Sequence, residues 1–273
     1  MTDANTTHSN PLSTPLSPPL SPLQVKVALI TGAGQGIGQG IAFSLAKRGV
    51  SIVAVGRTLS KCEKTVADIE ARFNGKAIAI ECDISNLDAL DALVSDSVAA
   101  FGRLDILVNN AVTTSINALM DTTLEEFDKG LRVGPMATLR LMQLAQPHLL
   151  EAGDGNIINL ATAAAKRWDS STYGVYAAEK EAIRALSRGA ACEWGPMGLR
   201  TNCILPLAKS PALEMWEQWR PEEAAAFAET VPMKRIGHCE DDIGEFVAML
   251  CSPESRYVNG QSIAIDGGQV NMG

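Results

Sequence analysis

Short apolar segments alternate with amphipathic segments along most of the chain. Six of the short segments are rich in Val, Ile, Leu and Ala and are apolar on both sides, which is typical of strands buried on both faces of a parallel sheet. These predicted strands cover residues 25–30, 51–55, 77–80, 106–108, 156–160 and 201–205. The alternation predicts an α/β fold with a doubly wound, parallel sheet and helices on both faces.

Apolar positions at helical spacing predict the helices between these strands. Ile37, Ile41 and Leu45 share one helix face, and Gly49 is suited to end that helix. The other predicted helices span 60–74, 86–101, about 124–151 and about 172–194. Residues 209–231 are also expected to be helical and follow the carboxyl end of a strand, where such sheets bind ligands. This segment is either a surface helical pair or a lid over a substrate.

The composition divides the chain into two parts. Residues 1–24 are rich in Ser, Thr and Pro, contain no Lys or Arg, and are predicted to form a disordered tail with polyproline II character. Residues 25–273 contain no linker and are predicted to form a single domain, which is an ordinary size for an α/β unit.

Charge and cysteine usage exclude several kinds of partner and site. The net charge is −8 and no cluster of Lys and Arg is present, which argues against nucleic acid and anionic membranes as partners. No segment is apolar enough to cross a bilayer. The cysteines lack metal-site spacing, so we expect no metal site and reduced core thiols in a cytoplasmic protein. These residues are Cys62, Cys82, Cys192, Cys203, Cys239 and Cys251.

A glycine-rich run follows the first predicted strand and opens the first predicted helix. Thr31 is followed by Gly32, Gly34, Gly36 and Gly38. Glycines allow a pyrophosphate to approach the backbone, and the helix N-terminus offers free N–H groups and the positive end of a dipole. The run therefore indicates a dinucleotide cofactor rather than a plain turn.

The residues after the second and third strands bear on the choice of cofactor. NAD binding favours an acidic residue after the second strand, but this chain has Gly56 and Arg57 there. The guanidinium can pair with a 2′-phosphate, which favours NADP, with NAD still possible; alternatively, Arg57 is a solvated loop residue. Asp83 and Ile84 are predicted to contact the adenine, or else to form a helix-capping turn.

A tyrosine and a lysine four residues apart form a candidate acid–base pair. Tyr176 and Lys180 share one face of a predicted helix. An ordinary phenol, with a pKa of about 10, is a poor catalyst at neutral pH, and a nearby ammonium is expected to lower that pKa. Tyr173 is not expected to serve, because Ala177 stands four residues after it.

Together these motifs resemble those of the classical short-chain dehydrogenase/reductase family over residues 25–273. Residues 31–38 resemble its TGxxxGIG motif and residues 176–180 its YxxxK motif. Residues 109–111 resemble its NNA, residues 200–202 its RxN, and residues 266–268 its DGG. The resemblance implies a Rossmann-like sheet of about seven strands, a catalytic NAD(P)-binding domain, hydride transfer between a nicotinamide and a carbonyl or alcohol, and a homo-oligomer, either a tetramer or a dimer.

The resemblance also assigns roles to residues. It implies catalysis by Tyr176 and Lys180, with Thr162 in place of a family serine. The residues expected to bind the cofactor are Gly32, Gly34, Gln35, Gly36, Ile37, Gly38, Arg57, Asp83, Ile84, Asn109, Ala111, Tyr176, Lys180, Pro206 and Ser210.

Several positions depart from the family pattern and suggest a divergent active site. Val112 replaces a glycine after NNA, Leu207 replaces the glycine after Pro206, and Gly134 stands where the family has a catalytic Asn. Because water can occupy the space of an Asn side chain, redox chemistry is still expected.

The sequence thus predicts an NADP(H)-dependent oxidoreductase that interconverts a small-molecule ketone and a secondary alcohol. The pocket is expected to be apolar, with contributions from Val112, Met136, Leu207, Trp216 and Trp219. Two alternatives stay open. One is a non-redox isomerase, lyase or cyclase of specialised metabolism on the same scaffold, and the other is a protein that binds the cofactor without turnover.

Overall fold

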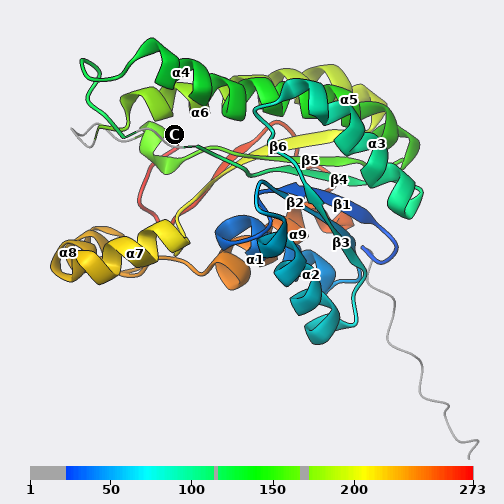
Figure 1. Cartoon of the computed structure of the whole chain (residues 1–273), viewed down its shortest axis with the longest axis horizontal. Coiled ribbons are helices and arrows are strands. Elements are labelled where there is room, and N and C mark those ends of the chain that lie inside the picture. The colour runs from blue at the N-terminus through cyan, green and yellow to red at the C-terminus, as the bar shows by residue number, and fades with distance from the viewer. Residues whose placement is uncertain (1–22, 114–115, 167–171, 273) are drawn as a thin grey trace, which may run out of the picture.

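A seven-stranded parallel sheet forms the centre of the computed structural model, which describes residues 23–113, 116–166 and 172–272 (Figure 1). The strand order is β3-β2-β1-β4-β5-β6-β7. The chain order therefore reverses between β1 and β4, which opens a crevice at the carboxyl ends of these strands. Most of the predicted tail lies outside the described residues, but Leu23, assigned to it, is fully buried in the core.

The sheet confirms the predicted fold class. All six predicted strands are present, with ends within two residues of those expected. The seventh strand, β7, was implied only by the family resemblance, because its short apolar segment carries little signal. The strands are β1 Val27–Thr31, β2 Ser51–Gly56, β3 Ala77–Glu81, β4 Ile106–Asn109, β5 Asn156–Leu160, β6 Arg200–Pro206 and β7 Ser262–Ile265.

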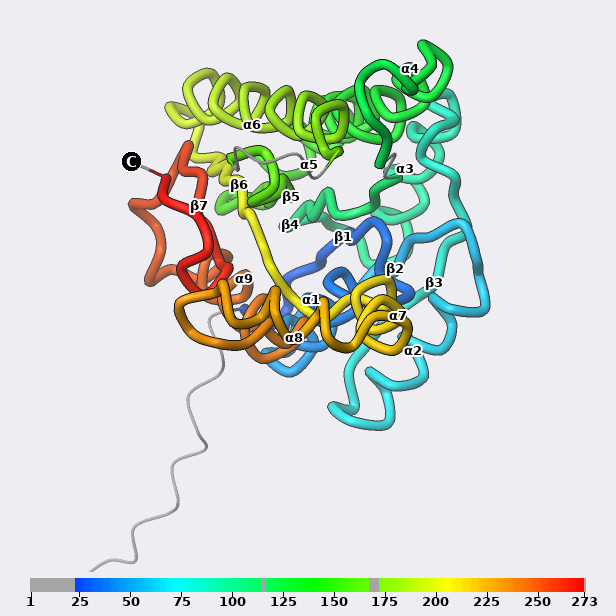
Figure 2. Tube along the Cα trace, turned by 90° about the vertical axis from the view of Figure 1, so that its left-hand side faces the viewer, coloured from blue at the N-terminus to red at the C-terminus, as the bar shows by residue number. Residues whose placement is uncertain are grey.

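Helices cover both faces of the sheet (Figures 1 and 2). Side chains of β1 alternate between the two faces: Ala28 and Ile30 belong to one buried cluster, and Val27 and Leu29 to the other. The first cluster packs on α1 Gly36–Ala46, α2 Leu59–Phe73 and α9 Glu245–Leu250. The second packs on α3 Leu90–Phe101, α5 Ala137–Glu151 and α6 Gly174–Trp194.

The long helix predicted over about 124–151 is not a single α-helix. Helix α4, Leu124–Leu131, starts at a capping box formed by Thr123 and Glu126. A π-helical turn, Arg132–Met136, then joins α4 to α5, and we call this turn the π segment. It contains Pro135, which has no N–H to donate and so interrupts the regular bonding.

The expectation of helix over 209–231 is confirmed by α7, Pro211–Trp219, and α8, Pro221–Thr230. Both follow the carboxyl end of β6 (Figure 2). Side chains of both helices line the cavity described below. The remaining helical turns are Leu87–Ala89, Ala163–Lys166, Gly195–Met197, Cys239–Gly244 and Pro253–Ser255.

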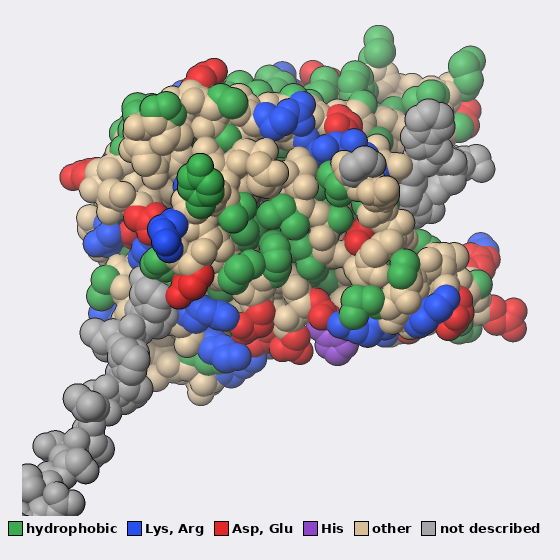
Figure 3. Space-filling model, turned by 180° about the vertical axis from the view of Figure 1, so that it is seen from behind, with side chains coloured by type: hydrophobic (Ala, Val, Ile, Leu, Met, Phe, Trp, Pro, Cys, Tyr) green, Lys and Arg blue, Asp and Glu red, His purple; other side chains and the backbone are tan. Residues whose placement is uncertain are grey.

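The described surface carries mixed charges, and the cysteines are unpaired. On the face seen in Figure 3, Lys and Arg side chains lie among Asp and Glu. No helix in the described parts of the chain combines the length and apolarity needed to span a bilayer. All six cysteines are free, but Cys192 is exposed on α6, so its assignment to the core was wrong. A helix has a solvent side, and an apolar neighbourhood in sequence does not show which side a residue takes.

Candidate active site

Two of the sequence motifs hold each other at the carboxyl ends of β1 and β4. The Thr31 hydroxyl oxygen accepts hydrogen bonds from the backbone N–H groups of Asn110 and Ala111, each at 3.0 Å. The Asn110 side-chain amide donates to the carbonyl oxygens of Thr31 at 2.8 Å and Gly32 at 3.2 Å. These bonds fix the glycine-rich turn against the NNA turn, so Ala111 contributes through its backbone.

The glycines of the turn are required by close backbone approaches. Gly32 has a φ of +68°, and a Cβ on Gly38 would lie 2.4 Å from the Gly32 carbonyl oxygen. A Cβ on Gly34 would lie 2.8 Å from the Cβ of Lys61 on α2. The turn therefore presents bare backbone at the N-terminus of α1, which fits the pyrophosphate of a dinucleotide.

We expect Gly38→Ala to lower both stability and cofactor affinity. The new Cβ meets the backbone of Gly32 rather than a flexible side chain, and such overpacking destabilises by about 1–3 kcal/mol. The turn must widen, so NADPH affinity should fall by about ten-fold or more. The matched control is Gly189→Ala on α6, where no atom would lie within 4 Å of the new Cβ. This variant should be more stable than the wild type by up to about 1 kcal/mol. Calorimetry and thermal unfolding check both. Tight NADPH binding by Gly38→Ala would contradict the role of the turn.

Charged residues gather where the adenosine end of a cofactor would lie. Arg57 is exposed just after β2, and Asp83 follows β3. Burial alone would raise the pKa of Asp83, but hydrogen bonds from Ser85 and the charges of Arg57 and Lys129 lower it overall. Sequence reasoning missed Lys61, whose ammonium donates to the Gln35 side-chain oxygen at 2.6 Å. Its signal in the sequence was its place in the first turn of α2, which starts two residues after Arg57.

The asparagine that begins the NNA motif, Asn109, is held inside the core. Asn109 is buried, and its amide donates to the Asn159 side-chain oxygen at 2.8 Å. Its own Oδ1 has no hydrogen-bond partner within the described residues. Ile84 is likewise buried in the core beneath the predicted adenine site. Asn109 and Ile84 therefore support the site from the core side.

The start of α7 closes over the N-terminus of α1. Ser210 caps α7, with its hydroxyl accepting from the Leu213 N–H at 3.4 Å. A Cβ on Gly36 would lie 3.1 Å from Pro211 and 3.7 Å from the Ser210 Cβ. Pro206, Ser210 and Ile37 consequently line one cavity. The structure thus brings three of the predicted cofactor residues together beside the glycine-rich turn.

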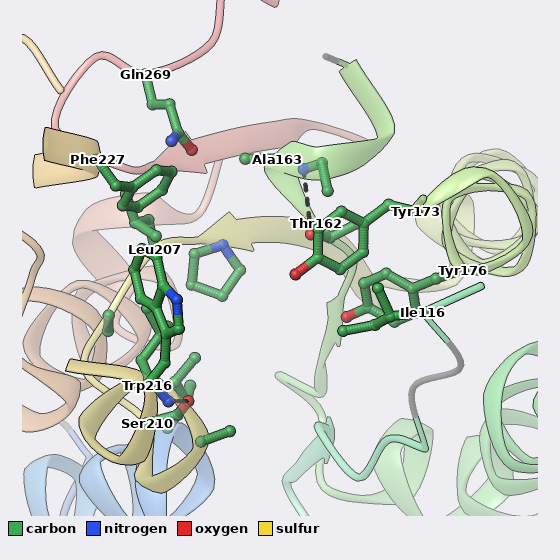
Figure 4. A pocket seen from close by; sticks show the side chains of 16 residues that line it. Ile116, Thr162, Ala163, Tyr173, Tyr176, Leu207, Ser210, Trp216, Phe227 and Gln269 are labelled. Atoms are coloured by element: carbon green, nitrogen blue, oxygen red, sulfur yellow. Dashed lines mark hydrogen bonds between the residues drawn. The ribbon is translucent and has the colours of Figure 1, made fainter. Parts of the chain in front are cut away.

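Two of the three predicted catalytic side chains, Thr162 and Tyr176, line this cavity, and Lys180 is buried beside Tyr176. Thr162 follows β5, and its hydroxyl oxygen accepts from the Ala164 N–H at 3.2 Å (Figure 4). The Thr162 side chain acts to lower the pKa of Tyr176. Lys180, one turn along α6 from Tyr176, places its ammonium 5.7 Å from the phenol ring centre and donates to the Leu160 carbonyl at 2.8 Å. The cluster is built from the end of β5 and one face of α6.

The electrostatics of this cluster differ from the expectation of a lowered tyrosine pKa. Burial raises the pKa of Tyr176 to about 12, against the opposing effect of the Thr162 hydrogen bond, while Glu179 and Tyr173 raise it further. Burial also lowers the pKa of Lys180 to about 8. The four-residue spacing correctly predicted that Tyr176 and Lys180 lie close together on α6. The spacing could not predict that the Lys180 ammonium points to Leu160 or that the Tyr176 phenol is buried.

The cavity has a volume of about 580 Å³ and an apolar lining. Tyr173 and Tyr176 direct their hydroxyl groups into it, facing Leu207 and Trp216 on the other side (Figure 4). Trp216 packs edge-on against Phe227, with 5.7 Å between ring centres, which fixes α7 against α8. None of the described residues lining the cavity is acidic, basic or a histidine.

Only part of the predicted pocket lining is correct. Leu207 and Trp216 line the cavity, whereas Val112, Met136 and Trp219 do not and are exposed. Tyr173 was set aside in the search for an acid–base pair, yet it lines the cavity beside Tyr176. Sequence reasoning also missed Ile116, Leu213, Phe227 and Gln269.

The RxN and DGG motifs anchor the C-terminal segment. Arg200 donates to the Leu250 carbonyl at 2.8 Å, and Asn202 donates to the Val258 carbonyl at 2.9 Å. The Asp266 carboxylate accepts from the N–H groups of Gly268 and Val270, each at 2.9 Å. This turn delivers Gln269 to the cavity.

Comparison with known proteins agrees with this geometry. A family model described as enoyl-(acyl carrier protein) reductase matches residues 32–269. The 12α-hydroxysteroid dehydrogenase of Clostridium sp. is 36% identical over 232 residues, which are 83% of this chain and 89% of that protein. The chain belongs to the short-chain dehydrogenase/reductase family. It is therefore an NAD(P)-dependent oxidoreductase.

Solved structures of other family members superpose closely. A putative short-chain alcohol dehydrogenase from Sinorhizobium meliloti has a TM-score of 0.84 at 30% identity, over 92% of this chain and 98% of that one. A short-chain dehydrogenase from Burkholderia cenocepacia in complex with NADP has a TM-score of 0.82 at 33% identity, over 90% and 98%.

Gly134, which stands where the family has an Asn, has room for a side chain at its Cβ. A Cβ on Gly134 would lie 3.9 Å from the Glu179 Cβ and from the Ile183 Cδ1, which are ordinary contacts. No neighbour within the described residues therefore needs this room at the Cβ.

We expect Gly134→Asn to change turnover by less than about ten-fold, because Tyr176 and Lys180 already supply the acid and the charge. The substitution should raise stability slightly, since Gly is poorer than most residues in a helix by about 0.5–1 kcal/mol. Steady-state kinetics and the melting temperature of the variant measure both effects. A gain in turnover of an order of magnitude or more would instead identify a redox centre weakened by the loss of Asn.

Proposed function

We propose that this protein interconverts an uncharged, apolar ketone and its secondary alcohol, with NADP(H) as cofactor and Tyr176 as the proton donor or acceptor. The observation that carries the proposal is the meeting of Thr162 and Tyr176 in one apolar cavity beside the glycine-rich turn, with the Lys180 ammonium 5.7 Å from the centre of the Tyr176 ring. Neither a non-redox reaction nor cofactor binding without turnover requires this arrangement.

The residues divide the work of the reaction. When bound, the nicotinamide exchanges a hydride with the carbonyl carbon. The Thr162 and Tyr176 hydroxyl groups hold the carbonyl oxygen between them, and in reduction Tyr176 donates its phenol proton to that oxygen. The Lys180 ammonium, on the same helix face, stabilises the phenolate left behind. Thr162 orients the oxygen, since its own hydroxyl is fixed by the Ala164 N–H.

The lining of the cavity supports the substrate class. A charged substrate would have to leave water for a site without a compensating charge, which is strongly unfavourable. Contact with the Trp216 and Phe227 rings would stabilise a bound apolar ring system. Tyr173 and Gln269 offer hydrogen bonds away from the reacting oxygen. The 12α-hydroxysteroid dehydrogenase relative is named for a substrate of this apolar kind.

Two ketones of similar size test the proposal. We expect NADPH to be oxidised in the presence of a neutral bicyclic ketone, with the alcohol formed in equal amount. A keto acid of similar size should react far more slowly. Product formation without consumption of NADPH would show a non-redox enzyme, and cofactor binding without turnover of any ketone would show a binding protein.

The preference for NADPH is part of the same proposal. Arg57, after β2, and Lys61, at the start of α2, provide two cations near the glycine-rich turn. Gly56 leaves no carboxylate at the end of β2 to repel a 2′-phosphate. The assembly of the chain into a tetramer or a dimer stays a prediction.

A further inference from the structure

A second cavity adjoins the cavity that Thr162 and Tyr176 line, which we call the catalytic cavity. The second cavity has a volume of about 590 Å³ and lies beside the end of β7, where Ala264 and Ile265 contribute to its lining. Leu207, directly after β6, is the only described residue that lines both cavities. The two cavities therefore lie on either side of this residue.

The C-terminal turn forms the rest of the division. Gln269 lines the catalytic cavity, whereas its neighbours Gly268 and Val270 line the second cavity. The buried Asp266 carboxylate holds this turn by accepting from the N–H groups of Gly268 and Val270, each at 2.9 Å. Because successive residues of the turn face opposite cavities, its hydrogen-bonded backbone lies between them.

The backbone of Leu207 is held as firmly as that turn. Its N–H donates to the Ile265 carbonyl at 2.9 Å, and its own carbonyl accepts from the Gly237 N–H at 3.2 Å. Pro206 and Ala208, on either side of Leu207, both line the catalytic cavity. A smaller side chain at position 207 should therefore open the division between the cavities without moving the backbone.

The two cavities differ in the chemistry of their linings. No described residue that lines the catalytic cavity is charged. In the second cavity, by contrast, the Arg235 guanidinium donates to both carboxylate oxygens of Asp242, at 2.6 and 2.7 Å, beside the apolar side chains of Met233 and Val270. A flexible apolar chain with a polar end would suit this mixed lining.

We propose that Leu207 is a specificity-determining residue that closes the catalytic cavity and restricts the substrate to a compact ring ketone. This inference rests on the proposed function of the site. The Tyr173 and Tyr176 hydroxyl groups face Leu207 across the cavity (Figure 4). A group on the side of the substrate away from its carbonyl therefore meets the Leu207 side chain. A long group there is excluded in the wild type and would pass into the second cavity if that side chain were small.

The test compares Leu207→Ala with the wild type on two ketones. One is decalone, a compact bicyclic ketone, and the other is decalone that carries a hydroxyhexyl chain on the ring away from the carbonyl. The wild type should reduce the second ketone with a much lower kcat/KM. In Leu207→Ala we expect the ratio of kcat/KM for the long ketone to that for decalone to rise by about ten-fold or more.

The matched control is Leu213→Ala. Leu213 lies on α7 and lines the catalytic cavity but not the second one, and both leucines are half-buried. The control removes the same atoms, so it should lower kcat/KM for both ketones and leave their ratio nearly unchanged. An equal rise of the ratio in both variants would show that only the total volume matters, and would overturn the inference.

Binding provides a second measurement that needs no turnover. Calorimetry with NADP⁺ present measures the affinity of each ketone, because the oxidised cofactor has no hydride to transfer. The affinity ratio of the long ketone to decalone should rise in Leu207→Ala as the kinetic ratio does. A ratio that stays at the wild-type value in folded Leu207→Ala would refute the role of Leu207. If the wild type reduces no ketone, the proposed function fails, but the two affinities still decide the role of Leu207.

Leu207→Val covers the case in which Leu207→Ala does not fold. It shortens the side chain by one carbon and keeps most of the packing. Its ratio of long ketone to decalone, in kinetics and in binding, should lie between those of the wild type and Leu207→Ala. A wild-type ratio in folded Leu207→Val, when Leu207→Ala does not fold, would count against the inference.

Discussion

Replacing Tyr176 with Phe is expected to lower the rate of ketone reduction by about 10²–10⁴-fold, the usual contribution of a positioned general acid. The variant loses one hydroxyl group, which shares the cavity with Thr162 and is the proposed source of the proton. NADPH affinity should change little, because the ring and Lys180 remain. Steady-state kinetics with calorimetry of NADPH binding separate the two effects. Reduction at the wild-type rate would refute the mechanism.

Tyr173→Phe is the matched control for this variant. Tyr173 lines the same cavity, and its ring centre lies 6.1 Å from that of Tyr176. It has Ala177 where Tyr176 has Lys180, so its hydroxyl lacks the ammonium that would stabilise a phenolate. We therefore expect Tyr173→Phe to retain most of the turnover and to alter KM only for substrates with a second polar group.

The raised pKa of Tyr176 predicts different pH dependences for ketone reduction and alcohol oxidation. With a pKa of about 12 the phenol is protonated at neutral pH, which suits proton donation to a ketone. In the reverse reaction the phenolate must accept the alcohol proton, and its fraction grows as the pH rises toward that value. Alcohol oxidation should therefore accelerate with pH, while ketone reduction should stay nearly constant until strongly alkaline pH.

The fold could be predicted from the sequence because its strands are buried on both faces. Apolar runs such as Ile52–Val55 have only one common explanation in an alternating α/β pattern. The break in the long helix was not predicted, although Pro135 marks it, because helical periodicity continues across a π-helical turn. The strand β7 is short and partly exposed, so its pattern was weak.

Site residues could be predicted where a sequence motif fixes the local geometry. They could not be predicted where tertiary packing determines which side chains reach the cavity. The glycine-rich run and the spacing of Tyr176 and Lys180 are local features, and Ile37 of the first motif and Tyr176 of the second line one cavity. Phe227 and Gln269 reach that cavity only through the packing of α8 and the C-terminal turn.

Replacing Arg57 with Ala is expected to weaken NADPH binding by about ten-fold or more while leaving NADH binding nearly unchanged. A bidentate, charge-assisted contact with the 2′-phosphate contributes roughly 1.5–3 kcal/mol, and NADH has no such phosphate. Calorimetry with each cofactor measures the ratio of the NADPH and NADH affinities in the wild type and the variant. Equal or tighter binding of NADH by the wild type would contradict the proposed preference, and Arg57 would then be a solvated loop residue.

Lys61→Ala extends this test to a residue that sequence reasoning missed. Its ammonium contacts Gln35 beside the glycine-rich turn, so we expect a smaller loss of NADPH affinity in the same direction. Lys76→Ala is the matched control, because this exposed lysine precedes β3 at the opposite end of the sheet and its loss changes the net charge equally. If Lys76→Ala weakened NADPH binding as much as Lys61→Ala did, only the overall charge would matter. A loss confined to Arg57 and Lys61 would locate the 2′-phosphate between β2 and α2.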